Sequence, residues 1–440
     1  MQRLALVFTF IGTFCMHSLH AQVPFYQDVF YGGVTGDGYS SVNLETTDTL
    51  KVYIESGSTI REAFLFVHTF EINGGTTIDR SMDFNGSTLQ LSASDAIMTN
   101  YSDPLGPQVI KHQVLAINVT NLVNDSQMNY PITPPVNQDP TGIDGIFGGF
   151  YLQIMYDNTA LGKVNVNSFI NNLDSDQLRL YSFVDLNPID LIQDVGFTFM
   201  GYAFCDTVVD GCYVSVDGSL IGLTGGVEST DELLCSGVRG AFYYQNSTLE
   251  GLDNDIANNQ MSGPDALASI EPYLLNNTQF DVLFDYQNGS GGAPPSPKSN
   301  PIFELFTAYT TTCDTFSVTT TPDTIACQDT QLQLNATGGQ TYEWLPTIGL
   351  SCADCPNPVF TADSTMNYTV RIWNNDSCSV VRPLHITVID NTGIEELINT
   401  KKELIKIIDF MGRETEFKPN TPLIFIYSDG TRERVMEIEE

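Results

Sequence analysis

The sequence predicts an all-β protein made of several β-sandwich domains, followed by a small C-terminal β-sandwich or hairpin module. Between residues 22 and 390, runs rich in Val, Ile, Thr, Phe and Tyr alternate with clusters of Gly, Asn, Asp and Pro, a pattern typical of strands joined by turns. Helical periodicity is scarce, and we expect one short helix, within Gly263–Leu275. The 440 residues allow about three domains, and 42% hydrophobic residues are enough to fill their cores.

The first 21 residues have the pattern of a secretory signal peptide. Arg3 supplies a positive charge, Leu4–Phe14 is an apolar run, and Ser18–Ala21 is a small or polar cleavage region. The run is shorter than the ~20 residues of a membrane span, and the bulky residue before Cys15 disfavours a lipoprotein. We therefore expect a mature chain that begins at Gln22 and has no transmembrane segment.

The mature chain is strongly acidic. Asp and Glu number 53 against 18 Lys and Arg, which gives the whole sequence a net charge of −35. Because such a chain repels phosphate groups, we expect no nucleic-acid partner and no docking on anionic membranes.

Eight cysteines remain after removal of the signal peptide, and this even number indicates four disulfides formed in an oxidising compartment. Zinc is the alternative, but the mature histidines lack ligand spacing and only one C-x-x-C motif is present. We expect Cys352 to pair with Cys355, and Cys327 to pair with Cys378 around a compact set of strands. The other four cysteines allow three connectivities. Of these we favour Cys205–Cys212 with Cys235–Cys313.

Residues 22–312 form one large β region, in which we expect two domains divided near residue 165. The segments with the clearest strand pattern are apolar on both faces, as central strands of a sandwich are. These runs are Arg61–Glu71, His112–Val123, Phe150–Tyr156, Phe280–Tyr286 and Ile302–Tyr309. A threonine-rich seam, Thr310–Asp323, ends the region.

Residues 313–390 are expected to form an immunoglobulin-like sandwich, because short alternating strands follow one another with tight turns. The stretches Tyr342–Pro346, Gly349–Pro358 and Tyr368–Val370 resemble the PKD-type immunoglobulin-like repeats of secreted Bacteroidota proteins. That resemblance implies a spacer or interaction module without catalysis. Trp344 and Trp373 suit either core packing or sugar stacking, and we favour core packing.

Residues 391–440 predict three short strands with two tight turns. They hold 7 of the 18 Lys and Arg residues and have a net charge of −4, whereas residues 22–390 have a net charge of −32. The turn and strand-end residues resemble the C-terminal sorting domain of type IX secretion substrates. The matching positions are Asp409, Gly412, Arg413, Glu414, Tyr427, Asp429, Gly430 and Thr431. The resemblance implies passage through the periplasm, recognition by the type IX secretion machinery, and a secreted or outer-membrane surface-attached product. An ordinary terminal hairpin is the alternative.

Residues 22–309 contain no known catalytic signature. Paired acids occur at Asp139 with Asp144 and at Asp253 with Asp255. We favour the interpretation that these acids lie in solvated loops. The second interpretation is Ca²⁺ binding at Asp253 and Asp255, and the least favoured is catalysis by the carboxylates. His68, within an apolar run, is expected to be structural rather than catalytic.

We therefore expect a non-catalytic binding or adhesion protein, whose partners are surface glycans or proteins, with Ca²⁺ as the only cofactor considered. The alternative is a secreted hydrolase of glycan or protein with carboxylates in residues 22–309. A cleft with converging carboxylates would favour the hydrolase.

Overall fold

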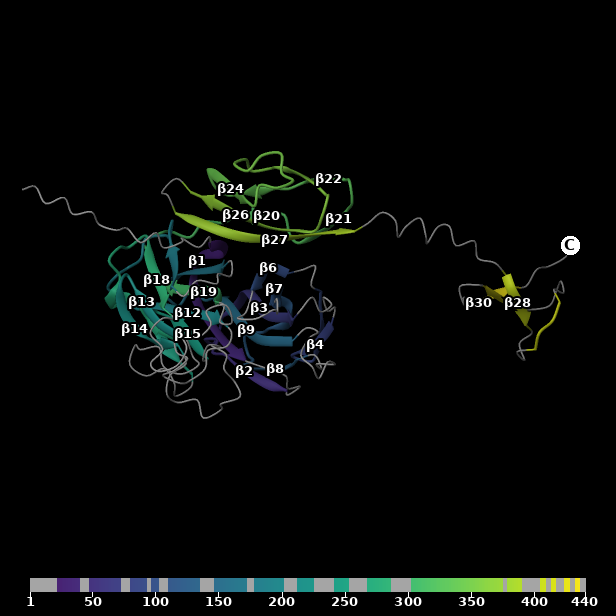
Figure 1. Cartoon of the computed structure of the whole chain (residues 1–440), viewed down its shortest axis with the longest axis horizontal. Coiled ribbons are helices and arrows are strands. Elements are labelled where there is room, and N and C mark those ends of the chain that lie inside the picture. Colours follow the sequence, from purple (N-terminus) through teal and green to yellow (C-terminus); the bar gives the residue numbers. More distant parts are fainter. Residues whose placement is uncertain are drawn as a thin grey trace, which may run out of the picture.

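The computed structural model describes residues 22–39, 47–72, 80–92, 96–102, 110–134, 146–171, 178–201, 212–224, 241–252, 267–285, 302–374, 378–389, 404–408, 413–416, 423–427 and 432–435. In these ranges the only helices are two single 3₁₀ turns, η2 (Thr120–Leu122) and η4 (Glu271–Tyr273), and the rest of the regular structure is strand (Figure 1). The all-β prediction is confirmed. No described helix is long and apolar enough to cross a membrane.

The helix expected within Gly263–Leu275 is wrong for the described part of that range. Strand β17 (Leu267–Ser269) pairs with β12, and the η4 turn follows it. Ile270, between the two, is fully buried in a core, so tertiary packing outweighs the local helical pattern.

Strand β1 (Gln22–Tyr39) joins two sandwiches into one body. Its first part, up to Tyr31, pairs with β10 (Lys163–Asn171), and its second part, from Gly32, pairs with β9 (Ile146–Asp157). Gly33–Gly36 also pair with β15 on another side of the strand. The two long sheets of the body therefore share one strand.

The first sandwich packs one of these sheets against a smaller one. The larger sheet contains β1, β9, β3 (Thr59–Ile72), β7 (Ile110–Asn118) and β6 (Ala96–Ser102), with β15 (Phe242–Gln245) and β16 (Thr248–Gly251) at its side. The smaller sheet contains β2 (Asp48–Lys51), β8 (Asn129–Thr133), β4 (Arg80–Phe84) and β5 (Ser87–Leu91). Leu65, Phe84 and Tyr130, all fully buried, belong to the core between them.

The second sandwich repeats this arrangement. Its larger sheet contains β17, β12 (Val195–Gly201), β19 (Ile302–Tyr309), β10 and β1. Its smaller sheet contains β11 (Leu178–Phe183), β18 (Phe280–Asp285), β13 (Cys212–Val216) and β14 (Ser219–Thr224). Residue 165, near which the sequence suggested a division, lies in β10, the first strand of the second sandwich after β1.

The two sandwiches pack through the remaining faces of their larger sheets. Phe64, Phe66 and Tyr151 of the first meet Phe303 and Phe306 of the second in one buried cluster. The body is therefore four sheets deep. Four of the five apolar runs lie in its two central layers, because those sheets are covered on both faces. The run Phe280–Tyr286 forms β18 in an outer sheet instead, and its described residues alternate between buried and more exposed positions.

Gly32 is required where β1 passes between the two sheets. A Cβ at this position would lie 1.9 Å from the backbone oxygen of Tyr156, which β-pairing holds in place. We expect Gly32→Ala to lower the free energy of unfolding by ~1–3 kcal/mol, measured by urea denaturation. Gly162→Ala is the control, because its Cβ would have no contact closer than 3.5 Å; equal effects of the two changes would contradict this account.

A further β-sandwich, which we call the immunoglobulin-like unit after the sequence prediction, lies over the body with its long strand β27 nearest to it (Figure 1). One sheet contains β21 (Thr324–Cys327), β27 (Ser379–Ile389), β26 (Met366–Trp373) and β24 (Thr341–Leu345). Two short strand pairs face this sheet. They are β20 (Thr319–Thr320) with β23 (Ala336–Thr337), and β22 (Gln331–Gln333) with β25 (Val359–Thr361). Trp344 is fully buried in this core and donates to the Cys355 carbonyl at 2.9 Å. Core packing, rather than sugar stacking, is thus the role of Trp344.

The cysteine pairing of this unit differs in part from the prediction. Cys352 pairs with Cys355 as expected, but Cys378 pairs with Cys313, and Cys327 forms no disulfide with another described cysteine. The predicted Cys327–Cys378 bond is wrong because the two residues lie at opposite ends of β27. Cys327 is in register with Ile389 at the end of β27, whereas Cys378 precedes its first residue. Eleven strand residues span about 35 Å, far beyond disulfide reach.

The favoured Cys235–Cys313 bond is also wrong, because Cys313 pairs with Cys378. Cys205 and Cys235 lie outside the described residues, and Cys212 begins β13 with no described side chain. The structure therefore leaves the pairing of these three untested.

Near the C-terminus, β28 (Leu404–Ile408), β29 (Leu423–Tyr427) and β30 (Arg432–Val435) form a separate antiparallel sheet. The backbone of Thr415 donates to Ile407, and Lys406 pairs with Glu414 at 3.1 Å on the surface. Of the proposed sorting residues, Arg413, Glu414 and Tyr427 are described. The remaining ones lie outside the described residues: Asp409, Gly412, Asp429, Gly430 and Thr431.

Candidate functional site

A cleft opens where two antiparallel strands, β1 of the body and β27 of the immunoglobulin-like unit, separate. The strands pair at one position in the described chain, Gln27 opposite Val381. Beyond it, Pro383 has no N–H to donate and β1 is irregular at Phe25, between Pro24 and Tyr26. Pairing therefore stops, and the space between the two strands has a volume of about 710 Å³.

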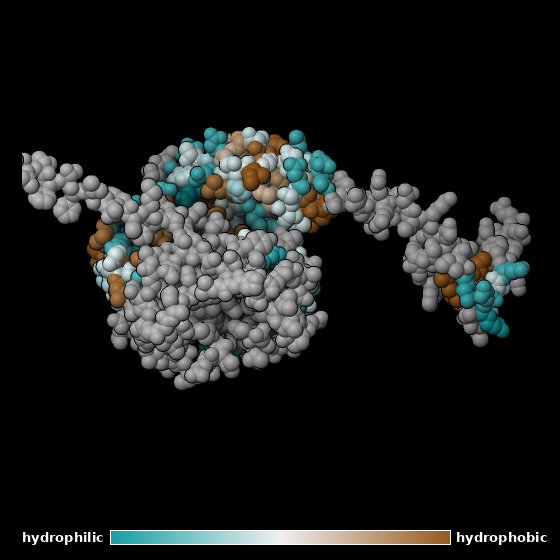
Figure 2. All heavy atoms as spheres, viewed as in Figure 1, coloured by the Kyte–Doolittle hydropathy of each residue, from teal (hydrophilic) through white to brown (hydrophobic). Residues whose placement is uncertain are grey.

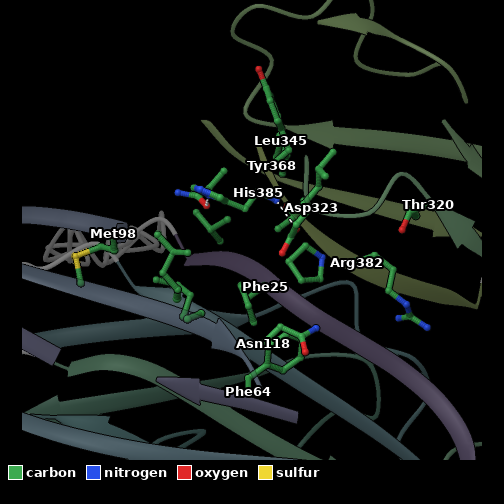
Figure 3. A pocket seen from close by; sticks show the side chains of 18 of the residues that line it. Phe25, Phe64, Met98, Asn118, Thr320, Asp323, Leu345, Tyr368, Arg382 and His385 are labelled. Carbon is green, nitrogen blue, oxygen red and sulfur yellow. Dashed lines mark hydrogen bonds between the residues drawn. The ribbon is translucent and has the colours of Figure 1, made fainter. Parts of the chain in front are cut away.

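The walls of the cleft are mostly apolar. Figure 3 shows Phe25 and Phe64 on the body side and Leu345 and Tyr368 on the immunoglobulin-like side, with Met98 at one end. Figure 2 shows the surface hollowed where the upper unit meets the body. A concave, largely apolar site at a domain boundary with a few polar groups is the usual form of a ligand site.

A buried ion cluster holds the two walls together at one end of the cleft. One oxygen of Asp28 accepts from Arg382 of β27 at 2.7 Å, from Arg61 of β3 at 2.8 Å and from the Tyr26 hydroxyl at 3.0 Å. Arg61 also contacts Asp157 at 3.1 Å. Asp28 is 1% exposed, so its charge depends on these partners rather than on water.

Burial by itself would raise the pKa of the Asp28 carboxyl. The positive charges of Arg382 and Arg61 and their hydrogen bonds outweigh that effect and hold the pKa below its usual value. The carboxylate therefore stays ionised, and the cluster joins three strands of the body to the immunoglobulin-like unit.

Further contacts fix the angle between the two walls. Ser379 exchanges hydrogen bonds with Asn187 at 2.8 and 2.9 Å, and Gln27 donates to Ser379 at 3.1 Å. At the far end, Asn367 donates to the Ala96 carbonyl at 3.0 Å. Together with the Cys313–Cys378 disulfide, these contacts make the cleft a preformed feature.

Two carboxylates face the cleft, one on each wall. Glu62 of β3 accepts long hydrogen bonds of 3.4 Å from Asn118 and Thr120. Asp323 accepts from the His385 backbone at 2.7 Å, as the dashed line in Figure 3 marks. Burial raises the pKa of Glu62 above its usual value, and the charge of Arg382 offsets this only in part.

The acids singled out in the sequence are not part of this site. Asp139, Asp144, Asp253 and Asp255 lie outside the described residues, as does the signal-peptide segment. Within the described ranges, no group of three or more His, Cys, Asp or Glu side chains is arranged to hold a metal ion.

His68 has a packed position in the centre of the body. Its ring stacks on Phe303 at 3.9 Å between centroids, and its Nε2 lies 3.1 Å from Nδ1 of His112. Burial lowers the pKa of His112 to about 3, with the charge of Arg179 acting in the same direction. Burial likewise lowers the pKa of His68, so both rings are neutral at pH 7 and packed away from solvent.

Sequence reasoning missed the cleft because its residues come from segments far apart in the chain. Two local signals existed. Arg61 and Glu62 are charges at the start of a strand whose other residues are mostly apolar, and Pro383 interrupts an otherwise regular strand. Neither signal shows that the two segments face each other.

No protein-family profile matches the chain, and no curated protein matches it. Among solved structures, the chain is similar to PNGF-II, determined in a C2 space group, with 11% identity and a TM-score of 0.23, and the match covers 67% of this chain and 66% of that one. The trimeric ectodomain of the C. elegans fusion protein EFF-1 gives 8% identity and a TM-score of 0.11, with 86% and 95% covered. Both superpositions are too loose to support a functional comparison.

Proposed function

We propose that this chain is a non-catalytic binding protein whose ligand site is the cleft between the body and the immunoglobulin-like unit. The observation that carries the proposal is the combination of a 710 Å³ apolar cleft with walls fixed by a disulfide and a buried ion cluster. Such a site binds without first ordering its own walls, which saves the entropy that a mobile surface loses on binding.

Binding is favoured over hydrolysis by the state of the acidic groups. Asp28 is neutralised by two guanidinium groups, and one oxygen of Asp323 accepts from the backbone of its own unit. Burial raises the pKa of Glu62, and a glycosidase needs a second, separately tuned carboxylate at a defined distance from it.

A bulky side chain placed at the entrance of the cleft tests whether the cleft binds ligands. Thr99 is exposed on β6 and lines the cleft, so Thr99→Trp should reduce binding of the uncharged apolar dye Nile red by about tenfold or more in Kd, since the indole occupies apolar volume that the dye needs. Thr88→Trp is the matched control, because Thr88 is an exposed threonine on β5 that does not line the cleft. Equal dye binding by both variants would reject the cleft as the site.

We also propose that the protein is exported by the type IX secretion machinery and that residues 391–440 direct this export. The support comes from the sequence: an N-terminal segment with signal-peptide pattern, and a terminal module with the two turns and strand ends of a sorting domain. The module is also richer in basic residues than the body, with 7 Lys and Arg in its 50 residues against 10 in residues 22–390, and this difference would help a receptor to distinguish it.

Deleting residues 391–440 is expected to leave the protein in the periplasm of a type IX-competent host. Gly430→Val should have a similar effect, because a β-branched residue resists the positive φ of an Asp-Gly hairpin turn. The measurement is the fraction of protein outside the cells, with a reporter carrying only the signal peptide as control. Normal export of the deleted chain would reject the sorting role.

A further inference from the structure

Four nitrogen donor groups on the walls of the cleft each make at least one hydrogen bond within the protein. Arg382 donates to the Gln27 carbonyl and to Asp28, Asn118 to Glu62, Asn367 to the Ala96 carbonyl, and the His385 backbone to Asp323. These bonds use one of the two N–H groups on each of the Asn118 and Asn367 amides, so few donors remain for a ligand rich in acceptors.

The acceptors of the cleft are less fully used. A carboxylate has about four acceptor positions, and the hydrogen bonds above use two of those on Glu62 and one of those on Asp323. The N–H and C=O of one strand residue point to the same edge, and alternate residues share an edge. The His385 N–H points to Asp323, so the Pro383 carbonyl, two residues earlier on β27, faces the same side.

The net charge of the cleft also favours a ligand that donates hydrogen bonds, and in particular a cationic one. The two guanidinium groups of Arg61 and Arg382 are matched by the carboxylates of Asp28 and Asp157. Glu62 and Asp323 are then the excess charge of the cleft, and both are negative. A cation beside Glu62 would favour its ionised form, which burial now disfavours.

On the basis of the proposed function, we propose that the cleft binds an extended, basic segment of a partner protein. A Lys or Arg side chain meets Glu62 and Asp323, and the flanking apolar side chains pack on Phe25, Phe64 and Leu345. A polypeptide suits the site because its backbone N–H groups are further donors, and because the space lies between two diverging antiparallel strands.

The test uses the full chain and two labelled pentapeptides with blocked ends, Leu-Phe-Lys-Phe-Leu and Leu-Phe-Glu-Phe-Leu, followed by fluorescence anisotropy at pH 7. The lysine peptide should bind about tenfold more tightly than the glutamate peptide. Glu62→Gln should remove most of this preference. Asp314→Asn is the matched control, because Asp314 is a 94% exposed carboxylate that does not line the cleft, and it should leave the preference unchanged.

The outcomes separate this inference from the proposed function. If Thr99→Trp weakens both peptides while the wild type binds them equally, the cleft is a binding site and the basic-ligand inference is wrong. If Thr99→Trp weakens neither peptide, nor the dye, the proposed site itself is wrong. Hexylamine is included as a competitor, and displacement at the same concentration as the lysine peptide would overturn the commitment to a polypeptide.

Discussion

Replacing Cys378 with serine is expected to lower the free energy of unfolding by about 4 kcal/mol under non-reducing conditions. The Cys313–Cys378 disulfide closes a separation of 65 residues, and the chain-entropy estimate for a loop of that size gives this value. The bond also joins the immunoglobulin-like unit to the body beside Val29, in a buried cluster. Equilibrium denaturation in urea, without reductant, measures the effect.

Cys327→Ser is the control that makes this result specific. Cys327 forms no disulfide in the described chain and is only half-buried, so its replacement should change the free energy of unfolding by less than about 1 kcal/mol. A large loss for Cys327→Ser together with a small loss for Cys378→Ser would show that the pairing in the structure is incorrect.

Asp28→Asn should cost about 3–5 kcal/mol, because it removes the charge that two buried guanidinium groups share. Asp157→Asn is the matched control: Asp157 also contacts Arg61, but its side chain is 40% exposed, and exposed pairs contribute about 1 kcal/mol or less. Urea denaturation of both variants at pH 7 measures the difference. Similar losses for the two would mean that Asp28 does not organise the cluster.

The pH dependence of this prediction follows from the lowered pKa of Asp28. A carboxyl whose folded-state pKa lies below its unfolded value of about 4 stabilises the fold above pH 4. That contribution is lost as pH falls through the folded-state pKa. Below pH 4, the free energy of unfolding of the wild type should therefore fall more steeply with pH than that of Asp28→Asn. Equal slopes for the two proteins would contradict the lowered pKa of Asp28.

Local patterns in the sequence predicted the parts of the structure that depend on nearby residues. Runs such as Phe150–Tyr156 predicted central strands because their apolar character records burial on both faces. Cys352 and Cys355 were paired correctly because they are three residues apart. Cys327 and Cys378 were not, because only the parallel register of β21 against β27 shows that they lie at opposite ends of a strand.

The cleft depends on information of a different kind. Phe25, Glu62 and Leu345 come together only after the immunoglobulin-like unit has docked on the body, and docking relies on single contacts such as Gln27 with Ser379. The hydrophobic pattern of Arg61–Glu71 correctly indicated a buried strand. It gave no sign that the two charges at its start face a second domain.

The pairing of β1 with β27 also determines when the binding site comes into existence. Asp28 and Arg382 are 354 residues apart, so the ion cluster cannot close until the chain as far as β27 is free to fold. Contacts of such long sequence separation form late and slowly, after local hairpins and sheets. Truncation before β27 therefore yields a body that has one wall of the cleft and nothing to hold a ligand against it.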